Sequence, residues 1–150
     1  MDAKEYLRRP NRILGDIIIQ REKAETLREN VLPKGVSFDK EKIQSVAGDK
    51  MANYAARLEE IEDKLEELTE EYYQAINDIE RVIYLVDNED AREVLAKRYI
   101  ARKPWIKIET EMEYMSIATV YRAHKTGLRA VTKILAEEEQ KNGQAKKTKI

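Results

Sequence analysis

Residues 51–86 decide the fold, and they read MANYAARLEEIEDKLEELTEEYYQAINDIERVIYLV. Apolar residues recur here in alternating steps of three and four over about five heptads, which is the spacing typical of a coiled coil. They are Met51, Tyr54, Leu58, Ile61, Leu65, Leu68, Tyr72, Ala75, Ile79, Val82 and Val86. At ~1.5 Å per residue the helix is about 50 Å long. Its apolar stripe must therefore pack on another helix of the chain, on a second copy, or on both.

The composition of the whole chain agrees with an all-α fold. Of the 150 residues, 38% are charged and 42% are apolar, with 5 glycines and 3 prolines, a mixture that favours long solvated helices. The absence of cysteine excludes disulfides, thiolate nucleophiles and cysteine-bound zinc. We see no signal peptide and no apolar run of ~18 residues, so we expect a cytoplasmic protein without a membrane-spanning helix.

Another helix is expected before the heptads, over residues 11–31. Its apolar residues fall at helical spacings: Ile13, Ile17, Ala24, Leu27 and Val31. Pro33 ends it, and the glycine and turn-forming residues that follow predict a loop. We therefore predict an antiparallel helical arm, formed by residues 11–31 against 51–86, within a first domain of residues 1–86.

The loop before the heptads contains one further expected element. Asp39 is a candidate N-cap for a short helix that runs to about Val46. Gly48 and Asp49 then separate this short helix from the long one.

After the heptads the pattern changes to three shorter helices. The run from Asp87 to Asp90 offers N-cap residues for the first of them. Pro104 suits the first turn of the second, whose inner face carries Trp105, Ile108 and Met112. A turn at residues 113–115 leads to a longer helix opened by Ser116. These last two helices have the lengths of a DNA-binding helix-turn-helix, which predicts a head over residues 87–136 and a flexible basic tail over 137–150.

The helix opened by Ser116 separates apolar from basic residues. Its inner stripe is Val120, His124, Leu128, Val131 and Leu135, and its outer stripe is Ala118, Arg122, Lys125, Arg129 and Lys133. Residues 116–150 hold 8 basic and 3 acidic residues, whereas residues 51–86 hold 3 basic and 10 acidic ones. The inner stripe is expected to dock the helix and the outer one to face phosphate, although a merely solvated basic face is the alternative.

A helix-turn-helix reads base edges with the first residues of its second helix and meets the phosphate backbone with later ones. The expected base-contacting residues are Ile117, Ala118, Thr119, Tyr121 and Arg122, of which Arg122 suits a guanine edge. The expected phosphate-contacting residues are Ser116, Lys125, Arg129, Lys133, Arg102, Lys103 and Lys107.

Several short runs in this region are familiar. They are REVLAKRYI at 92–100, WIKI at 105–108, YMS at 114–116 and VYR at 120–122, followed by His124 and Leu128. Over roughly residues 90–135 the chain resembles small phage-encoded transcription regulators of the ArpU and RinA type. The resemblance implies a C-terminal half similar to sigma-factor region 4, which reads the −35 promoter element, and a phage or prophage protein of Gram-positive bacteria that activates late genes. Two residues depart from the usual pattern: Glu109 replaces a small residue, and Glu113 replaces a glycine.

A homodimer is expected, because one head contacts few phosphates, and a second head related by a two-fold axis doubles the number of contacts. The predicted oligomerisation residues are Met51, Tyr54, Leu58, Ile61, Leu65, Leu68, Tyr72 and Ile79. Action of a single head beside RNA polymerase is the other option. Two further functions stay open: a small terminase subunit that recognises phage packaging DNA, and a coiled-coil adaptor that binds only protein.

Nothing in the sequence favours catalysis. It has no glycine-rich phosphate loop and no serine elbow. His124 is the only histidine and lies on an inner stripe, so it is interpreted as a core residue. Carboxylate pairs such as Glu59 and Asp63 are interpreted as the solvated flank of the long helix. We therefore expect a non-enzyme with no cofactor, metal or small-molecule substrate, whose main partner is double-stranded DNA.

Overall fold

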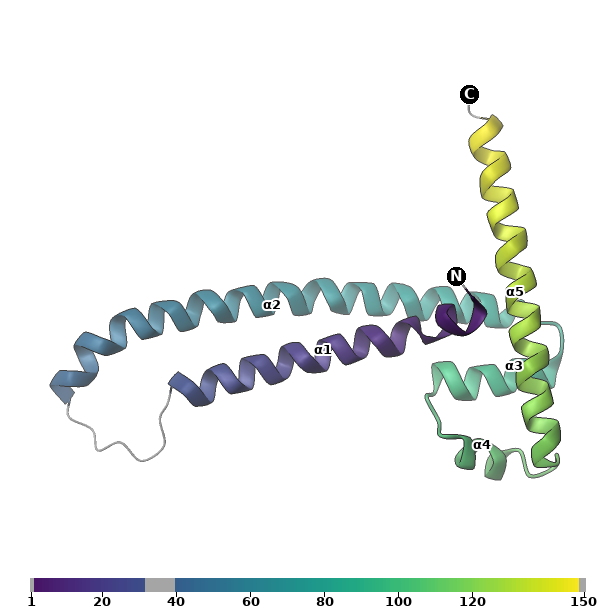
Figure 1. The fold of residues 1–150 in the computed structure, drawn as a ribbon, viewed down its shortest axis with the longest axis horizontal. Coiled ribbons are helices and arrows are strands. Elements are labelled where there is room, and N and C mark those ends of the chain that lie inside the picture. Colours follow the sequence, from purple (N-terminus) through teal and green to yellow (C-terminus); the bar gives the residue numbers. More distant parts are fainter. Residues whose placement is uncertain (1, 32–39, 149–150) are drawn as a thin grey trace. The chain divides into compact units, whose positions relative to one another are not determined.

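The structure is a computed structural model, and it describes residues 2–31 and 40–148. Every regular element in these residues is helical, which confirms the all-α class. The elements are α1 (Ala3–Val31), α2 (Lys40–Tyr84), α3 (Glu89–Leu95), the π-helical turn η1 (Ala96–Ile100), α4 (Trp105–Glu111) and α5 (Ile117–Thr148), as labelled in Figure 1. None of the described helices is both long and apolar enough to cross a membrane.

The chain divides into two compact units. We call Met1–Pro10 together with Gln74–Ile150 the head unit, and Asn11–Tyr73 the arm unit. These bounds differ from the predicted divisions at residues 86 and 136, because α2 contributes its last turns, and α1 its first turns, to the head unit. The single run of heptads thus serves two different cores.

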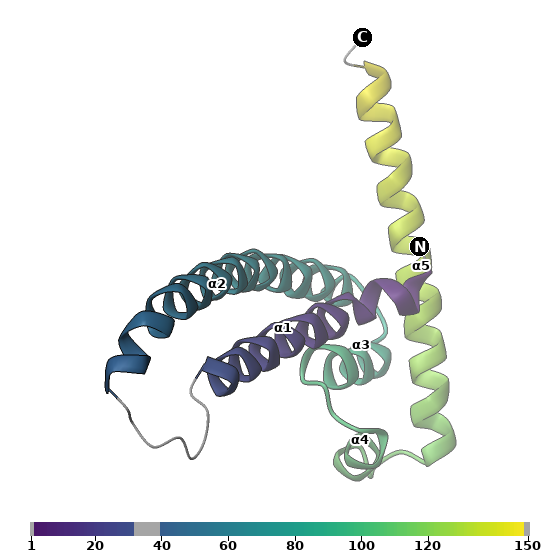
Figure 2. The ribbon, with the colours of Figure 1, turned by 60° about the vertical axis from the view of Figure 1, so that its left-hand side comes forward.

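In the arm unit, α1 and α2 run side by side in opposite directions in both Figure 1 and Figure 2. Ile17 of α1 is buried, as are Ile61 and Leu68 of α2, and these residues mark the seam between the helices. The neighbouring heptad residues are half-buried: Tyr54, Leu58, Leu65 and Tyr72. The heptad spacing therefore identifies the inner face of α2 correctly, and the chain's own α1 covers part of that face.

The core of the head unit joins segments that are far apart in the sequence. Its buried residues are Ala3, Leu7, Ile79, Val82, Ile83, Val86, Ala91, Leu95, Tyr99 and Val131. Full burial of a large aliphatic side chain contributes about 1.5–3 kcal/mol, so Leu7 makes the start of α1 part of this core. Ion pairs add to the same connections, between Arg9 and Asp78 at 3.8 Å and between Arg81 and Glu138.

The predicted start of the first helix, at residue 11, is wrong. The helix α1 begins at Ala3 and contains Pro10. A proline inside a helix removes one backbone hydrogen bond, here the one to the carbonyl of Tyr6. Both Leu7 and Pro10 are fully buried, and this burial offsets the loss.

Two other helices are longer than predicted. The helix α2 begins at Lys40 and continues through Gly48, because a single glycine costs a helix only about 1 kcal/mol. The helix α5 continues to Thr148, through the segment predicted to be a flexible tail. Lys, Glu, Gln and Ala, which dominate that segment, are good helix formers, and extending an existing helix needs no new nucleus. The predicted loop after Pro33 and the cap at Asp39 lie outside the described residues.

Candidate nucleic-acid interface

A second group of buried side chains holds α3, α4 and α5 together. It comprises Val94, Ile108, Met112, Val120 and Ala123, with Trp105 and Met115 packed against it. The inner faces predicted for the short and long helices are therefore confirmed. Because these faces are buried, the opposite faces of α4 and α5 are the ones available to a partner.

The turn between α4 and α5 is closed by hydrogen bonds. The Met115 N–H donates to the carbonyl of Met112 at 3.0 Å. The Thr119 N–H donates to Ser116 Oγ at 3.2 Å, and the two hydroxyl oxygens lie 2.7 Å apart. The predicted N-cap at Ser116 is thus confirmed. Ser116 and Thr119 were also predicted to contact DNA, and in the structure they fix the first turn of α5.

The outer face of α5 carries a row of cations, which we call the basic stripe: Arg122, Lys125, Arg129 and Lys133. All four side chains are exposed, and within the described part of the chain none of them forms an ion pair. At 3.6 residues per turn they fall within roughly 80° of one another. The fully buried Val120 and Val131 lie on the opposite side of the helix. The basic stripe is therefore a solvated face that is free to meet anions.

The residues predicted to contact bases share the first turns of α5, and all are exposed: Ile117, Ala118, Thr119, Tyr121 and Arg122. Ile117 leaves 58% of its surface in solvent. The first turns of α5 thus expose both apolar and basic side chains, and major-groove readout uses both kinds of contact.

Tyr121 is held by α4. Its ring centroid lies 5.0 Å from that of Trp105 in a tilted arrangement, and its hydroxyl donates to Glu109 Oε1 at 3.0 Å. That hydrogen bond, together with burial, raises the pKa of Tyr121. Trp105 and Glu109 are four residues apart on α4, so they present adjacent side chains on one face. Sequence reasoning singled out Tyr121 but missed this role of Glu109, because the contact depends on the packing of α4 against α5.

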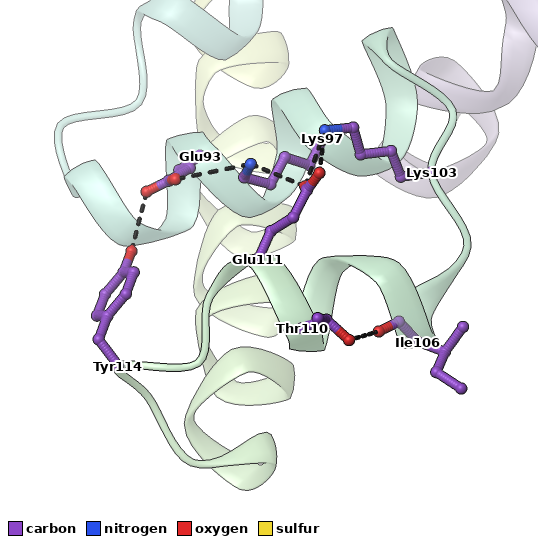
Figure 3. Close-up of polar contacts among 7 residues, drawn as sticks. All are labelled: Glu93, Lys97, Lys103, Ile106, Thr110, Glu111 and Tyr114. Carbon is purple, nitrogen blue, oxygen red and sulfur yellow. Dashed lines mark hydrogen bonds and ion pairs between the residues drawn. The ribbon is translucent and has the colours of Figure 1, made fainter.

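A network of charged and polar groups ties α3, η1 and α4 together (Figure 3). Both oxygens of Glu111 accept from Lys103 Nζ, at 2.7 and 2.8 Å, and Oε2 also accepts from Lys97 Nζ at 3.0 Å. These lysines lower the pKa of Glu111. Glu93 lies 3.9 Å from Lys97 and accepts a 3.0 Å hydrogen bond from the Tyr114 hydroxyl. Sequence reasoning did not connect these residues.

One of the predicted phosphate contacts takes part in this network and stays a prediction. Lys103 was predicted to contact phosphate, but its amine is paired with Glu111 inside the chain. The reason is the fold of the preceding loop, in which Arg102 adopts a φ of 57° and the Lys103 N–H donates to the carbonyl of Lys97 at 3.0 Å. Of the other cations predicted beside this loop, Arg102 and Lys107 are exposed.

Trp105 is also contacted by η1 and by the second turn of α5. The Arg98 guanidinium lies 5.0 Å from the ring centroid, and the His124 ring lies 4.8 Å away, edge to face. His124 is 8% exposed, and its pKa is lowered to about 4, first by burial and then by the nearby cations Lys4, Arg98 and Arg8. The imidazole is therefore neutral at pH 7, and its interpretation as a core residue is confirmed.

The residues predicted to mediate oligomerisation do not share one environment. Ile79 is fully buried in the head unit, and Ile61 and Leu68 are buried in the arm unit. Met51 is 52% exposed. Of the predicted set, the exposed and half-buried residues are the ones that a second copy is able to reach.

Comparison with protein-family models, curated proteins and solved structures finds no match to this chain. Among the described residues, no group of three or more acidic or histidine side chains is placed to hold a metal ion.

Proposed function

We propose that this chain is a sequence-reading DNA-binding protein in which α4, the turn and α5 act as a helix-turn-helix. The observation that carries the proposal is the basic stripe on the side of α5 opposite its buried face: four exposed cations that form no ion pair with any described residue. Several other cations of the head unit, among them Lys97, Lys103 and Arg81, are instead paired with carboxylates of the same chain. A row of solvated cations along one face of a helix, whose opposite face is buried, presents a surface suited to phosphate.

The two ends of the basic stripe would contact different parts of the DNA. Arg122 is near the start of α5, where a helix-turn-helix meets base edges, and its planar guanidinium suits the two acceptors of guanine. Lys125, Arg129 and Lys133 follow along the helix and would neutralise phosphates without regard to sequence. Ile117, Ala118 and Thr119 add apolar and hydroxyl contacts at the groove.

The biological role that we propose is regulation of late genes in a phage or prophage, as the resemblance to ArpU- and RinA-type regulators implies. The protein would act as a dimer, because two heads supply the phosphate contacts that one lacks. In the arm unit, Ile18, Ile19 and Met51 expose 47%, 54% and 52% of their surfaces, and they are available to a second copy. Rings of many copies in solution would instead favour a packaging protein, the small terminase subunit.

The salt dependence of DNA binding tests the proposal. A labelled duplex of mixed sequence is titrated with protein between about 50 and about 200 mM salt. In one variant, Arg122, Lys125, Arg129 and Lys133 are all replaced by glutamine. In the matched control, the exposed cations of α1 are replaced in the same way: Arg12, Arg21, Lys23 and Arg28. Both variants lose the same charge.

We expect the slope of log K against log salt to become shallower by roughly three units in the stripe variant, since each lost phosphate contact contributes about 0.9. The control should keep the wild-type slope. Equal slopes in the two variants would contradict a DNA-binding role for α5.

The second candidate is a helical adaptor that binds only protein. The observation in its favour is a groove of the arm unit lined by Ile19, Leu27, Thr26 and Arg57 among others, beside the exposed Ile18. Failure of the wild-type protein to bind duplex DNA at any salt concentration in the titration would move the assignment to this candidate.

A further inference from the structure

Tyr121 is the only one of the five predicted base-contacting residues whose side chain is fixed at both its ring and its polar end by another helix. The ring packs against Trp105, and the hydroxyl donates to Glu109. Even so, 38% of its surface remains exposed. A contact that is immobilised before binding loses no rotamer freedom on binding, so such a residue discriminates between partners more sharply than a mobile one.

The hydrogen bond also decides which part of Tyr121 a partner meets. The hydroxyl proton is engaged by Glu109 Oε1 and is not free to donate to a partner, so the ring is the part of Tyr121 that offers a new contact. An aromatic ring in the major groove makes apolar contact, and the thymine methyl is the apolar group that a base edge offers there. A free tyrosine hydroxyl would instead donate to base acceptors or to phosphate.

Resting on the proposed function, we propose that Glu109 is a positioning residue that sets base preference at one position of the site by holding the Tyr121 ring toward a thymine methyl. Glu109 itself touches no base in this account. It acts by accepting the Tyr121 hydrogen bond, and an amide oxygen in its place would do the same.

The test is selection of bound sequences from a random duplex pool, carried out in parallel with several proteins. They are wild type, Glu109→Ala, Tyr121→Phe, the double variant, the conservative Glu109→Gln, and the control Glu113→Gln. Glu113 is an exposed acidic residue of the turn, and its replacement changes net charge by the same amount. Far-UV circular dichroism and urea unfolding of each variant establish that it is folded.

We expect one position of the selected site to prefer thymine in the wild-type protein, by roughly threefold or more, the value of one buried methyl group. Glu109→Ala and Tyr121→Phe should each reduce the thymine preference at that position. The double variant should reduce it no further than either single variant, because both substitutions remove the same hydrogen bond. Glu109→Gln and Glu113→Gln should keep it.

Three results would overturn the inference. One is that Glu109→Ala selects the same DNA sequence as wild type, which would show that Glu109 has a structural role only. Another is a uniform rise in affinity shared by Glu109→Ala and Glu109→Gln, which would show that the carboxylate acts through its charge. The third is that Glu113→Gln reduces the thymine preference as much as Glu109→Ala does. Failure of the proposed function itself is distinguishable, because the wild-type protein would then select no sequence.

Discussion

The Tyr99 hydroxyl oxygen lies 2.9 Å from Nε2 of His124, which joins the end of η1 to α5 inside the head unit. The two rings also stack, with centroids 5.9 Å apart. The hydrogen bond satisfies a buried imidazole nitrogen that would otherwise be costly to bury. Burial and nearby cations lower the pKa of this imidazole and keep it neutral. Protonation of His124 at low pH should therefore destabilise the head unit.

The first prediction concerns that pH dependence. His124 has a pKa of about 4 in the folded chain, against an ordinary value near 6.5. Between these two values the unfolded chain binds a proton that the folded chain does not. The stabilisation is therefore complete above about pH 6.5 and is lost as the pH falls toward 4, by about 2 to 3 kcal/mol.

Urea unfolding at pH 7 and at pH 4.5 measures the effect, with His124→Gln as the control. The difference between wild type and variant isolates His124, because the carboxylates titrate in both proteins. A pH dependence that is the same in both would show that His124 does not couple protonation to folding.

The second prediction concerns the contact between α5 and α3. A Cβ atom added at Gly127 would lie 2.8 Å from Cγ and Cδ1 of the fully buried Leu95. The Gly127→Ala variant should therefore lose about 1 to 3 kcal/mol of unfolding free energy, despite the better helix propensity of alanine. At Gly143, on the same helix, an added Cβ has no neighbour within 4 Å. There the same substitution should be neutral or stabilise by up to about 1 kcal/mol. Equal effects on thermal unfolding at both positions would disprove the close approach.

The third prediction concerns Trp105, which contacts Arg98, Tyr121 and His124. Trp105→Ala should destabilise the head unit by about 2 to 4 kcal/mol, slightly less than loss of a fully buried aromatic, because Trp105 is only half-buried. Circular dichroism during urea unfolding measures the loss. A variant as stable as wild type would show that these contacts add nothing to folding.

The fourth prediction distinguishes two lysines by their partners. Lys103 is paired with Glu111, whereas Lys125 has no ion-pair partner in the described chain. Lys125→Gln should make the salt slope of DNA binding shallower by about 0.9, the value of one phosphate contact. Lys103→Gln should leave the slope unchanged. The reverse outcome would mean that DNA displaces Glu111 from Lys103.

Much of the fold follows from local patterns in the sequence. The heptads predict a long helix, and the cap at Ser116 and the inner stripe of α5 are found as predicted, since apolar period and capping chemistry are local properties. The predicted first helix began at residue 11, whereas α1 begins at Ala3 and contains Pro10. The proline is tolerated only through burial with Leu7 against distant segments, and that packing has no local signal.

The candidate site was predictable in part. Exposure of the basic stripe follows from helical spacing alone. The pairing of Lys103 with Glu111 depends on the π-helical turn η1 and on the left-handed backbone of Arg102, and neither has a reliable sequence signature. The contact between Glu109 and Tyr121 depends on how α4 crosses α5, which is set by the packing of Ile108, Met112 and Val120 rather than by spacing along one helix.

The central claim is that the first turns of α5 read DNA sequence through Arg122. The most direct test is selection of bound duplexes from a random pool at near-physiological salt, with wild type, Arg122→Ala and Lys133→Ala in parallel. The account predicts an enriched motif that loses its preference at one base position in Arg122→Ala and is unchanged, though more weakly bound, in Lys133→Ala. The absence of any enriched motif, or the same sequence-independent weakening in both variants, would contradict it.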